Sequence, residues 1–576
     1  MDENNGLFSV ALTHDGAIAV VEDGKLLFCV EQEKQDNNPR YQEIRNLDAV
    51  ESALAEHGLG VEDIDEYVVD GWDGDVESQF HVLSGGTPIV LKGGPYTEGK
   101  NGALLSAVDG TGLLLGGKSN PYRSYPHVSA HVAGAYCTSP FAQLGQPALC
   151  LVWDGGMAPR LYHIQRDEAR FIDHLFPIIG QMYAAAGHHF GPYAKTGGAQ
   201  WDLGVAGKLM AYIALGLVDA DIVALFDRIY RERFAGDTEV ARDYRRNLHL
   251  PDISLAAIRD FFRACVPQLQ HKPHEDVLAS FHTFLERLLV GEMELALQRH
   301  SIPDPRKLCI SGGCALNIKW NSALRASGLF DAIWIPPFPN DSGSAIGAAC
   351  CAMAAKKGFM PLEWSVYSGP ASKTGDLVQG WSASPCSVAE LAHILAQDKP
   401  VVFLAGRAEL GPRALGARSI LAAATSPTMK GLLNDVKRRE FFRPVAPICL
   451  EDRALAVFYP GSPDPYMLFD HQTRDEWRDR IPAVVHLDGS ARLQTIARSS
   501  GHPVAQLLIE YEKLTGIPLL CNTSANYPGR GFFPDAASAC EWGQVDHVWC
   551  DGLLLTKAGA TSFAASIDDT ASFGIP

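Results

Sequence analysis

The N-terminal part of the chain alternates short apolar runs with glycine turns. Residues 9–33 carry β-branched and apolar residues interrupted by HDG and EDG turns, which predicts three strands joined as a meander. Helix-like and strand-like patterns then follow one another: 47–58 and 127–136 are helix-like, whereas 66–72 and 147–156 are strand-like. Such alternation predicts an α/β fold.

The rest of the chain continues this alternation. An amphipathic segment at 277–300 predicts a helix, and the KLCISGGCALN segment after it predicts a strand, a glycine turn and a second helix. Near the C-terminus we expect strands at 399–406 and 518–526, and helices at 414–425 and 429–440.

The periodicity weakens around residues 356–370, where proline and glycine interrupt the segment KKGFMPLEWSVYSGP. We therefore place a domain boundary there, with an N-terminal domain at 1–360 and a C-terminal domain at 361–576. A chain of 576 residues is too long for one ordinary hydrophobic core, so its length also favours two domains.

The composition is that of a globular protein, with 47% hydrophobic and 20% charged residues. A formal net charge of −18 would repel a phosphate backbone, so we expect no nucleic-acid partner. No apolar run is long enough to span a bilayer and the start, MDENNG, has no signal-peptide pattern, so we expect a cytoplasmic protein without a membrane partner. The 13 cysteines form no C-x-x-C pair and are interpreted as small buried residues.

Two histidines four residues apart form the first candidate site. His127 and His131 would lie on one face of the predicted helix, close enough together to hold one metal ion. Asp154 and Asp341 occur in turns of the kind that α/β proteins use for site residues. Two imidazoles and two carboxylates suit Fe(II), Mn(II) or Zn(II). The alternative is two ordinary histidines on a helix face, one of them in contact with a carboxylate.

Three glycine turns, each after an apolar strand, form the second candidate site. Backbone N–H groups in such turns can approach an anion closely, and the N-terminal end of a following helix adds positive charge. The turns are His14-Asp15-Gly16, Asp154-Gly155-Gly156 and the segment from Ser311 through Gly312 and Gly313 to Asn317. Each turn alone could be a simple chain reversal, but the set of three favours a nucleotide site.

The C-terminal part gathers cations in an otherwise acidic chain. A planar guanidinium binds two phosphate oxygens at once, so these cations are interpreted as a binding site for a phosphate-bearing substrate. The candidates are Arg413, Arg418, Lys437, Arg443 and Arg492, with Ser524 and Asn526 as neutral hydrogen-bonding partners. For the adjacent Arg438 and Arg439, next to Glu440, we expect a solvated basic face instead.

These motifs together resemble a known family. The HDG turn, the HVSAH helix, the WDGG and SGGCALN turns and the NDSGSAIG segment are similar to the actin-like ATPase fold of the tRNA threonylcarbamoyl-transfer proteins. The whole chain resembles the NodU/CmcH-type O-carbamoyltransferases, which modify nodulation factors and antibiotics. The segments GPYAKTGGAQWDLGVAGKLMAY and CNTSANYPGRGFFPDAASACEWG suggest their antibiotic-tailoring branch. Many members have phenylalanine at the position of Ala525, a difference that affects aromatic packing and leaves Asn522, Ser524 and Asn526 in place.

The resemblance implies an α/β protein with an N-terminal actin-like ATPase (Kae1-like) domain and a C-terminal YrdC-like domain. It implies that His127, His131, Asp154 and Asp341 bind Fe(II), although Zn or Mn would suit the same ligands. ATP with Mg²⁺ and carbamoyl phosphate would be converted to carbamoyl-AMP in the C-terminal domain. The N-terminal metal site would then transfer the carbamoyl group to a hydroxyl of an antibiotic or similar small natural product. No oligomeric state is predicted.

Individual roles follow from this interpretation. His14 is the candidate general base for the acceptor hydroxyl, because an unperturbed imidazole titrates near neutral pH; the alternative is a turn histidine without a role. Lys208 is a candidate nucleotide contact, with an ordinary helix-surface lysine as the alternative. Two other functions stay open: a tRNA threonylcarbamoyl-transfer enzyme, which the acidic charge disfavours, and a non-catalytic metal- and nucleotide-binding protein.

Overall fold

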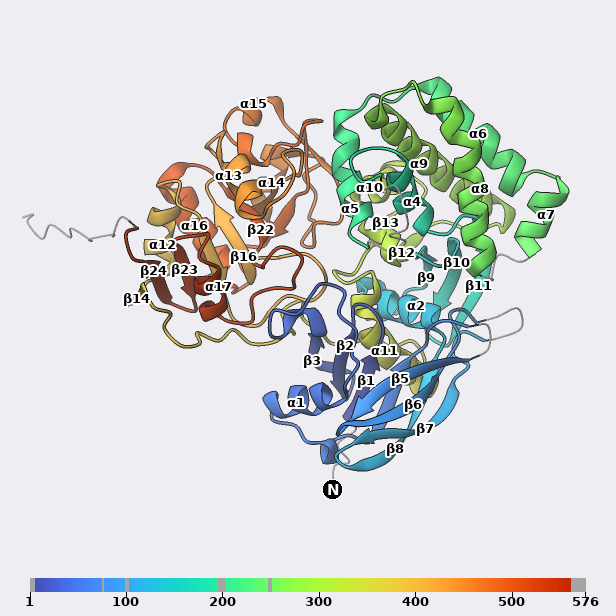
Figure 1. Cartoon of the computed structure of the whole chain (residues 1–576), viewed down its shortest axis with the longest axis horizontal. Helices are drawn as coiled ribbons and strands as arrows, with labels where there is room; N and C mark the ends of the chain where they lie inside the picture. The colour runs from blue at the N-terminus through green and yellow to red at the C-terminus, as the bar shows by residue number, and fades with distance from the viewer. Residues whose placement is uncertain (1–5, 75–76, 99–102, 195–202, 247–250, 561–576) are drawn as a thin grey trace, which may run out of the picture.

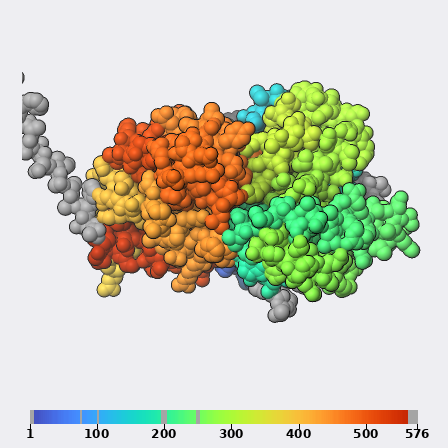
Figure 2. Space-filling model, turned by 90° about the horizontal axis from the view of Figure 1, so that it is seen from above, coloured from blue at the N-terminus to red at the C-terminus, as the bar shows by residue number. Residues whose placement is uncertain are grey.

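The computed structural model describes residues 6–74, 77–98, 103–194, 203–246 and 251–560. Its framework is a six-stranded and a five-stranded sheet in the N-terminal part and an eight-stranded sheet in the C-terminal part. Figure 1 shows the C-terminal part, in orange to dark red, beside the N-terminal part, in blue to yellow-green. The space-filling view in Figure 2 shows the C-terminal part packed directly against the green segments of the N-terminal part.

The first N-terminal sheet contains the strands β3 (Lys25–Glu31), β2 (Ala17–Glu22), β1 (Gly6–Ala11), β4 (Glu66–Asp70), β8 (Lys118–Tyr125) and β7 (Val108–Leu115), in that order. Strand β1 pairs antiparallel with β2 and parallel with β4, and all its residues are buried. Burial on both faces explains the nearly continuous apolar run of β1. Beside this sheet are α1 (Asp48–Glu56) and the hairpin of β5 (Ser78–Ser84) and β6 (Thr87–Gly93).

The second N-terminal sheet contains β11 (Glu168–His174), β10 (Arg160–Gln165), β9 (Ala148–Val152), β12 (Lys307–Ser311) and β13 (Ala332–Trp334), in that order. Strands β9 and β12 are parallel neighbours, so the turns that follow them meet at one edge of the sheet. Helix α10 (Ile318–Ala326) follows the turn after β12. Between β11 and β12 the chain forms α4 (Gln181–His189), α5 (Val205–Tyr212), α6 (Ala220–Tyr230), α7 (Glu239–Arg246), α8 (Pro251–Leu269) and α9 (His274–Arg299), the green helical region of Figure 1.

Two buried helices lie between the N-terminal sheets. Helix α11 (Ser344–Lys357) packs on β1, β2 and β4, whereas α2 (His127–Cys137) packs on β9 and β12, and the two helices pack on each other. Every residue of α2 is buried. Their close approach requires glycine, because a Cβ atom at Gly347 would lie 2.1 Å from the Ala130 carbonyl oxygen. Gly134 faces Gly347 across the same contact.

The C-terminal sheet contains β14 (Trp381–Pro385), β24 (Leu553–Lys557), β23 (His547–Cys550), β15 (Val401–Leu404), β16 (Arg418–Ala422), β22 (Leu519–Ser524), β17 (Ala446–Leu450) and β21 (Gln494–Ile496), in that order. Its core also includes residues of α12 (Val388–Leu395), α13 (Met429–Val436), α14 (Glu451–Val457), α16 (Pro503–Thr515) and α17 (Ala536–Trp542). Strand β16 is fully buried between β15 and β22.

Most of the predicted elements are confirmed, including the N-terminal meander, the long helix at 277–300 and the strands at 399–406 and 518–526. The helix predicted at 414–425 is wrong, because the centre of this segment forms β16. Its alanine-rich composition favours a helix, but pairing on both sides within the buried sheet outweighs that local preference. Among the described residues, no helix combines the length and apolarity that crossing a bilayer requires.

The packing of α2 on α11 gives a first testable prediction. Replacing Gly347 by alanine should lower the free energy of unfolding by about 1–3 kcal/mol, because the added methyl group would overlap the Ala130 carbonyl. The midpoint of urea unfolding measures this effect. The matched control is Gly291→Ala in α9, where a Cβ atom would meet nothing within 4 Å and helix propensity would stabilise the protein by up to about 1 kcal/mol. Equal midpoints for the two variants would contradict the proposed close packing.

Candidate metal centre and anion site

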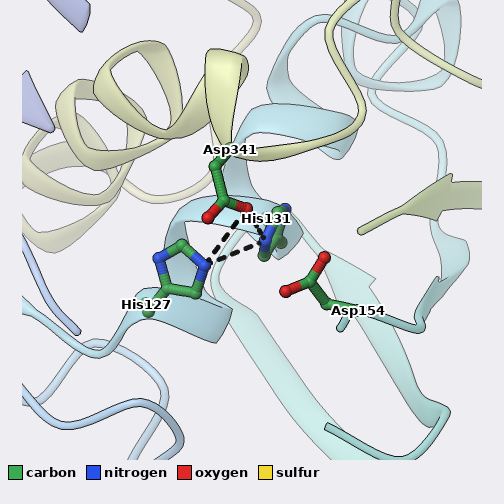
Figure 3. A group of neighbouring side chains, drawn as sticks. All are labelled: His127, His131, Asp154 and Asp341. Carbon is green, nitrogen blue, oxygen red and sulfur yellow. Dashed lines mark hydrogen bonds and ion pairs between the residues drawn. The ribbon is translucent and has the colours of Figure 1, made fainter. Parts of the chain in front are cut away.

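Four side chains from three parts of the chain converge in the N-terminal part. His127 and His131 lie one turn apart on α2, Asp154 follows β9, and Asp341 lies just before α11. Figure 3 shows the four side chains facing one another. One potential ligand atom from each residue lies within 4.8 Å of the others, and all four residues are buried. The structure therefore brings together the four residues that the sequence indicated as metal ligands.

Contacts of the Nδ1 atoms orient both imidazole rings. The Nδ1 atom of His127 lies 2.8 Å from a carboxylate oxygen of Asp70, at the end of β4, and Nδ1 of His131 lies 3.2 Å from the Ser311 hydroxyl. The two Nε2 atoms consequently face each other at 3.2 Å, and Oδ1 of Asp341 lies 3.5 Å and 3.4 Å from them. Ligand atoms that share a metal ion at about 2.1 Å lie roughly 3–3.5 Å apart, so this spacing suits one ion.

The charges of these groups also suit a cation. Burial disfavours protonation of His127, but Asp70 and Asp341 outweigh this effect and raise the pKa of the imidazole well above its ordinary value. Burial likewise opposes ionisation of Asp341, yet His127 and His14 keep the pKa of its carboxyl well below the usual range. Oδ2 of Asp341 is buried and accepts no hydrogen bond from any residue that the structure describes. A divalent ion fits here, because it would replace the protons as partners of the imidazoles and carboxylates.

Asp154 is held by two hydrogen bonds. The hydroxyl of Tyr96 donates to Oδ2 at 2.7 Å, and the backbone N–H of Gly313 donates to Oδ1 at 2.6 Å. The Tyr96 ring also stacks on His127, with ring centroids 5.1 Å apart, and Trp72 contacts both rings edge-on. Tyr96 therefore contacts both an imidazole and a carboxylate of the candidate metal centre, and Trp72 packs against Tyr96 and His127.

The glycine turns surround this centre. Gly312 has a φ of 89°, and a Cβ atom there would lie 2.4 Å from the Trp153 carbonyl oxygen, so glycine is required where the β12 turn passes the β9 turn. Gly155 faces open space, and Gly156 donates to the Tyr96 hydroxyl. The side chain of Asn317 caps α10. Because the N–H group of Gly313 donates to Asp154, it orients a candidate metal ligand and is not free for a nucleotide.

His14 lies at the edge of the metal centre and is about one third exposed, at 31%. Its Nε2 atom lies 3.3 Å from Oδ2 of Asp341, and its Nδ1 atom lies 3.2 Å from Asp15. Burial disfavours the charged ring, but Asp341 and Asp15 outweigh this effect and raise the pKa of His14 to about 9. A cation bound by Asp341 would compensate the charge that raises this pKa.

A second cluster, of four arginines, lies in the C-terminal part. Arg413, Arg439, Arg443 and Arg492 are half-buried, and the Nε atoms of Arg413 and Arg492 are buried with no hydrogen-bond partner among the described residues. Burial and the neighbouring guanidiniums lower the pKa of Arg413 to about 10 and that of Arg439 to about 9. Within the described part of the chain, only Arg443 among the four has a carboxylate partner, Glu440 at 3.7 Å. The unbalanced charge and unused donors suit a multiply charged anion.

The remaining C-terminal candidates support the backbone around this cluster. Arg418 is buried, and its guanidinium donates to backbone carbonyls of residues 370, 405, 406 and 417, which corrects the expectation that it binds an anion. Lys437 donates through Nζ to the Ser524 and Asn526 carbonyls, and the Asn526 side chain accepts from the Ser524 hydroxyl. The amide of Asn522 donates to the Ala414 carbonyl and to Gln494.

Sequence reasoning missed several residues of these sites. The expected solvated face is wrong for Arg439, which donates to the hydroxyls of Thr523 and Ser524, whereas Arg438 is exposed. Asp70 could have been found from the sequence, because it is the last residue of strand β4, and Asp154 likewise lies just after the end of β9. Tyr96 and Trp72 follow no sequence pattern.

Lys208 lies on α5, where its ammonium sits over the Tyr193 ring, 5.4 Å from the ring centroid. The Tyr193 hydroxyl donates to Glu440 at 2.7 Å, so Lys208 belongs to the contact between the N- and C-terminal parts. The same contact includes Lys319 of α10, which forms ion pairs with Asp470 and Asp488.

Comparisons with known proteins cover nearly the whole chain. Residues 6–350 match the family description "Carbamoyltransferase N-terminus", and residues 392–557 match "Carbamoyltransferase C-terminus". Nodulation protein U of Rhizobium tropici is 68% identical over 555 residues, which are 96% of this chain and 96% of that protein. The 3'-hydroxymethylcephem-O-carbamoyltransferase of Streptomyces clavuligerus is 32% identical over 545 residues, which are 92% of this chain and 95% of that protein.

Similarity to solved structures is much weaker. Full-length HypF in its phosphate- and nucleotide-bound form shares 12% identity at a TM-score of 0.31, and the match covers 63% of this chain and 47% of that one. The two family matches and the full-length relatives confirm the resemblance to the O-carbamoyltransferases. The chain belongs to the carbamoyltransferase family of enzymes.

Proposed function

We propose that this carbamoyltransferase uses ATP to transfer a carbamoyl group from carbamoyl phosphate to a hydroxyl of a small molecule. The observation that carries the proposal is the convergence of His127, His131, Asp154 and Asp341 around one position suited to a metal ion. The arginine cluster supplies the second requirement, a place for phosphate groups. Two different sites match a reaction in two stages, because forming an adenylate needs cations, whereas attack by an alcohol needs a base and an electrophile.

The C-terminal part, as a YrdC-like domain, would form the activated donor. Water would cleave carbamoyl phosphate to carbamate and phosphate, and a carbamate oxygen would then attack the α-phosphorus of ATP, which gives carbamoyl-AMP, a mixed anhydride, and releases pyrophosphate. Arg413 and Arg492 have buried donors without partners, so they are the residues proposed to bind the phosphate oxygens. Lys437 and Asn526 would act indirectly by fixing the backbone that follows β22.

The N-terminal part, as a Kae1-like domain, would carry out the transfer. His127, His131, Asp154 and Asp341 would hold Fe(II), or Zn or Mn, and a bound metal ion would supply Lewis-acid polarisation of an oxygen in the donor. Tyr96 keeps Asp154 oriented, and Asp70 keeps the Nε2 atom of His127 directed toward the centre. His14 is proposed to accept the proton of the acceptor hydroxyl, since it lies beside the centre and remains partly exposed.

The acceptor class is proposed from the relatives. Identity is 68% to a nodulation protein U and 32% to an enzyme whose name gives a hydroxymethylcephem acceptor. This difference favours an acceptor related to nodulation over the antibiotic that the sequence motifs suggested. The net charge of −18 and membership of the carbamoyltransferase family both favour a small-molecule acceptor over tRNA.

Removing the imidazoles tests the metal centre. The variant His127→Ala with His131→Ala should lose its bound metal and at least about 100-fold in transfer rate, since two of four ligands and their charge stabilisation are gone. Carbamoyl-AMP formation should persist, because it would take place in the C-terminal part. Elemental analysis measures the metal, and mass spectrometry measures both products. The control is His81→Ala, an exposed histidine on β5. Loss of adenylate formation to the same extent as transfer would argue against two separable sites.

Replacing an arginine tests the anion site. Arg492→Ala should reduce carbamoyl-AMP formation by about 10- to 100-fold, the effect of losing one charge-assisted hydrogen bond, and should leave the metal content unchanged. Isotope exchange between pyrophosphate and ATP in the presence of carbamoyl phosphate measures this step. The neighbouring exposed residue offers a matched control, Arg438→Gln. Unchanged exchange in Arg492→Ala would remove this cluster from the adenylation reaction.

A further inference from the structure

A loop of the N-terminal part reaches into the C-terminal part close to the arginine cluster. This loop, residues 31–41, follows β3 and is called the interdomain loop here. The backbone N–H of Arg40 donates to the Gly529 carbonyl at 3.0 Å, and the Gly531 N–H donates to the Asn38 carbonyl at 3.0 Å. A Cβ atom at Gly531 would lie 1.6 Å from the Glu33 carbonyl oxygen, so the two backbones are in direct contact. The interdomain loop is therefore fixed against the segment that follows Asn526.

The start of the interdomain loop is fixed to a second C-terminal segment. Lys34 is buried and donates through Nζ to Glu31 and to the backbone carbonyls of Glu409 and Gly411. The N–H of Gly411 donates in turn to Glu31 at 2.7 Å. Arg413 lies two residues further along this segment, so the interdomain loop contacts both C-terminal segments that border the arginine cluster.

Arg40 is the cation that this arrangement brings to the cluster. Its charge contributes to lowering the pKa of Arg413, Arg439 and Lys437, although burial is the larger cause at each of them. The Arg40 side chain is 35% exposed, so water and a ligand can reach it. Among the residues that the structure describes, its ion-pair partner is Glu33, at a loose 3.8 Å, and its guanidinium lies over the Tyr41 ring.

The position of Arg40 also relates the two sites. Burial disfavours its charged form, but Tyr41, Glu33 and Asp15 outweigh this effect and raise the pKa of the guanidinium. Asp15 is the residue that contacts His14 at the metal centre. Arg40 thus lies within the electrostatic influence of both sites.

We propose that Arg40 is a binding residue of the anion site, so that the N-terminal part supplies a cation to a phosphate group held by the arginines of the C-terminal part. The contacts of residues 31–40 with the C-terminal part, the exposure of the Arg40 guanidinium and the lack of a carboxylate closer than 3.8 Å among the described residues carry this inference, which rests on the anion site of the proposed function. The ligand class is a phosphate monoester or a phosphoric anhydride. A bound ligand would join the two parts of the chain through charge-assisted hydrogen bonds.

Titration of the full-length protein with inorganic pyrophosphate tests this inference. Calorimetry should show binding about 10-fold or more weaker in Arg40→Ala than in the unsubstituted protein, with Arg40→Lys intermediate, because lysine keeps the charge without the planar fork. The control is Arg45→Ala, an exposed arginine on the same segment paired with Glu43. In turnover, the KM for carbamoyl phosphate should rise in Arg40→Ala while the KM for the acceptor stays unchanged.

The possible results separate this inference from the proposed function. Equal pyrophosphate affinity in Arg40→Ala and the unsubstituted protein would overturn the role of Arg40 and leave the arginine cluster intact. Failure of the unsubstituted protein to bind pyrophosphate would overturn the anion site itself. A purely structural role would change the KM values of donor and acceptor together, and that result would also overturn the inference. If Arg40→Ala does not fold, Arg40→Gln, which keeps the length and planarity of the side chain, decides by the same measurements.

Discussion

The close packing of two buried helices is the constraint on which the candidate metal centre depends. Helix α2 carries His127 and His131, and Asp341 lies just before α11, so the distance between the helices sets the distance between imidazoles and carboxylate. Glycine at positions 134 and 347 allows the backbones to approach, and the two sheets hold the pair from outside. Strands β9 and β12 position the remaining ligand, because their parallel pairing places Asp154 beside Gly313. The packing of these helices and strands therefore fixes where the four side chains meet.

The C-terminal site depends on a different kind of interaction. Half-buried guanidiniums repel one another, and their lowered pKa values express the cost of keeping them charged without partners. Groups with strongly shifted pKa values cluster at functional sites, where a bound ligand can compensate their charge. Lys437, Arg418 and Asn522 are also polar and buried, but their donors bind backbone groups and hold the surrounding segments in place. Residues that look alike in sequence are thus divided between the proposed anion site and the support of the surrounding backbone.

Sequence reasoning succeeded where one local rule decides the outcome. Helical spacing placed His127 beside His131, and the position of Asp154 just after a buried strand placed it at the edge of a parallel sheet. Prediction from the sequence failed where tertiary contacts determine the local structure. The centre of the 414–425 segment forms a strand because the neighbouring strands pair with it, and Arg439 turns inward because hydroxyls of β22 accept its donors. Arg40 could not be found from its sequence neighbours, since its surroundings come from residues hundreds of positions away.

The central claim is that two histidines and two aspartates share one metal ion. Diffraction from crystals of the full-length protein grown with Fe(II), recorded on both sides of the iron absorption edge, tests it most directly. We expect one anomalous peak about 2.0–2.3 Å from a nitrogen or oxygen atom of each of His127, His131, Asp154 and Asp341. An anomalous peak elsewhere, or the same four side chains in a map with no peak between them, would contradict it.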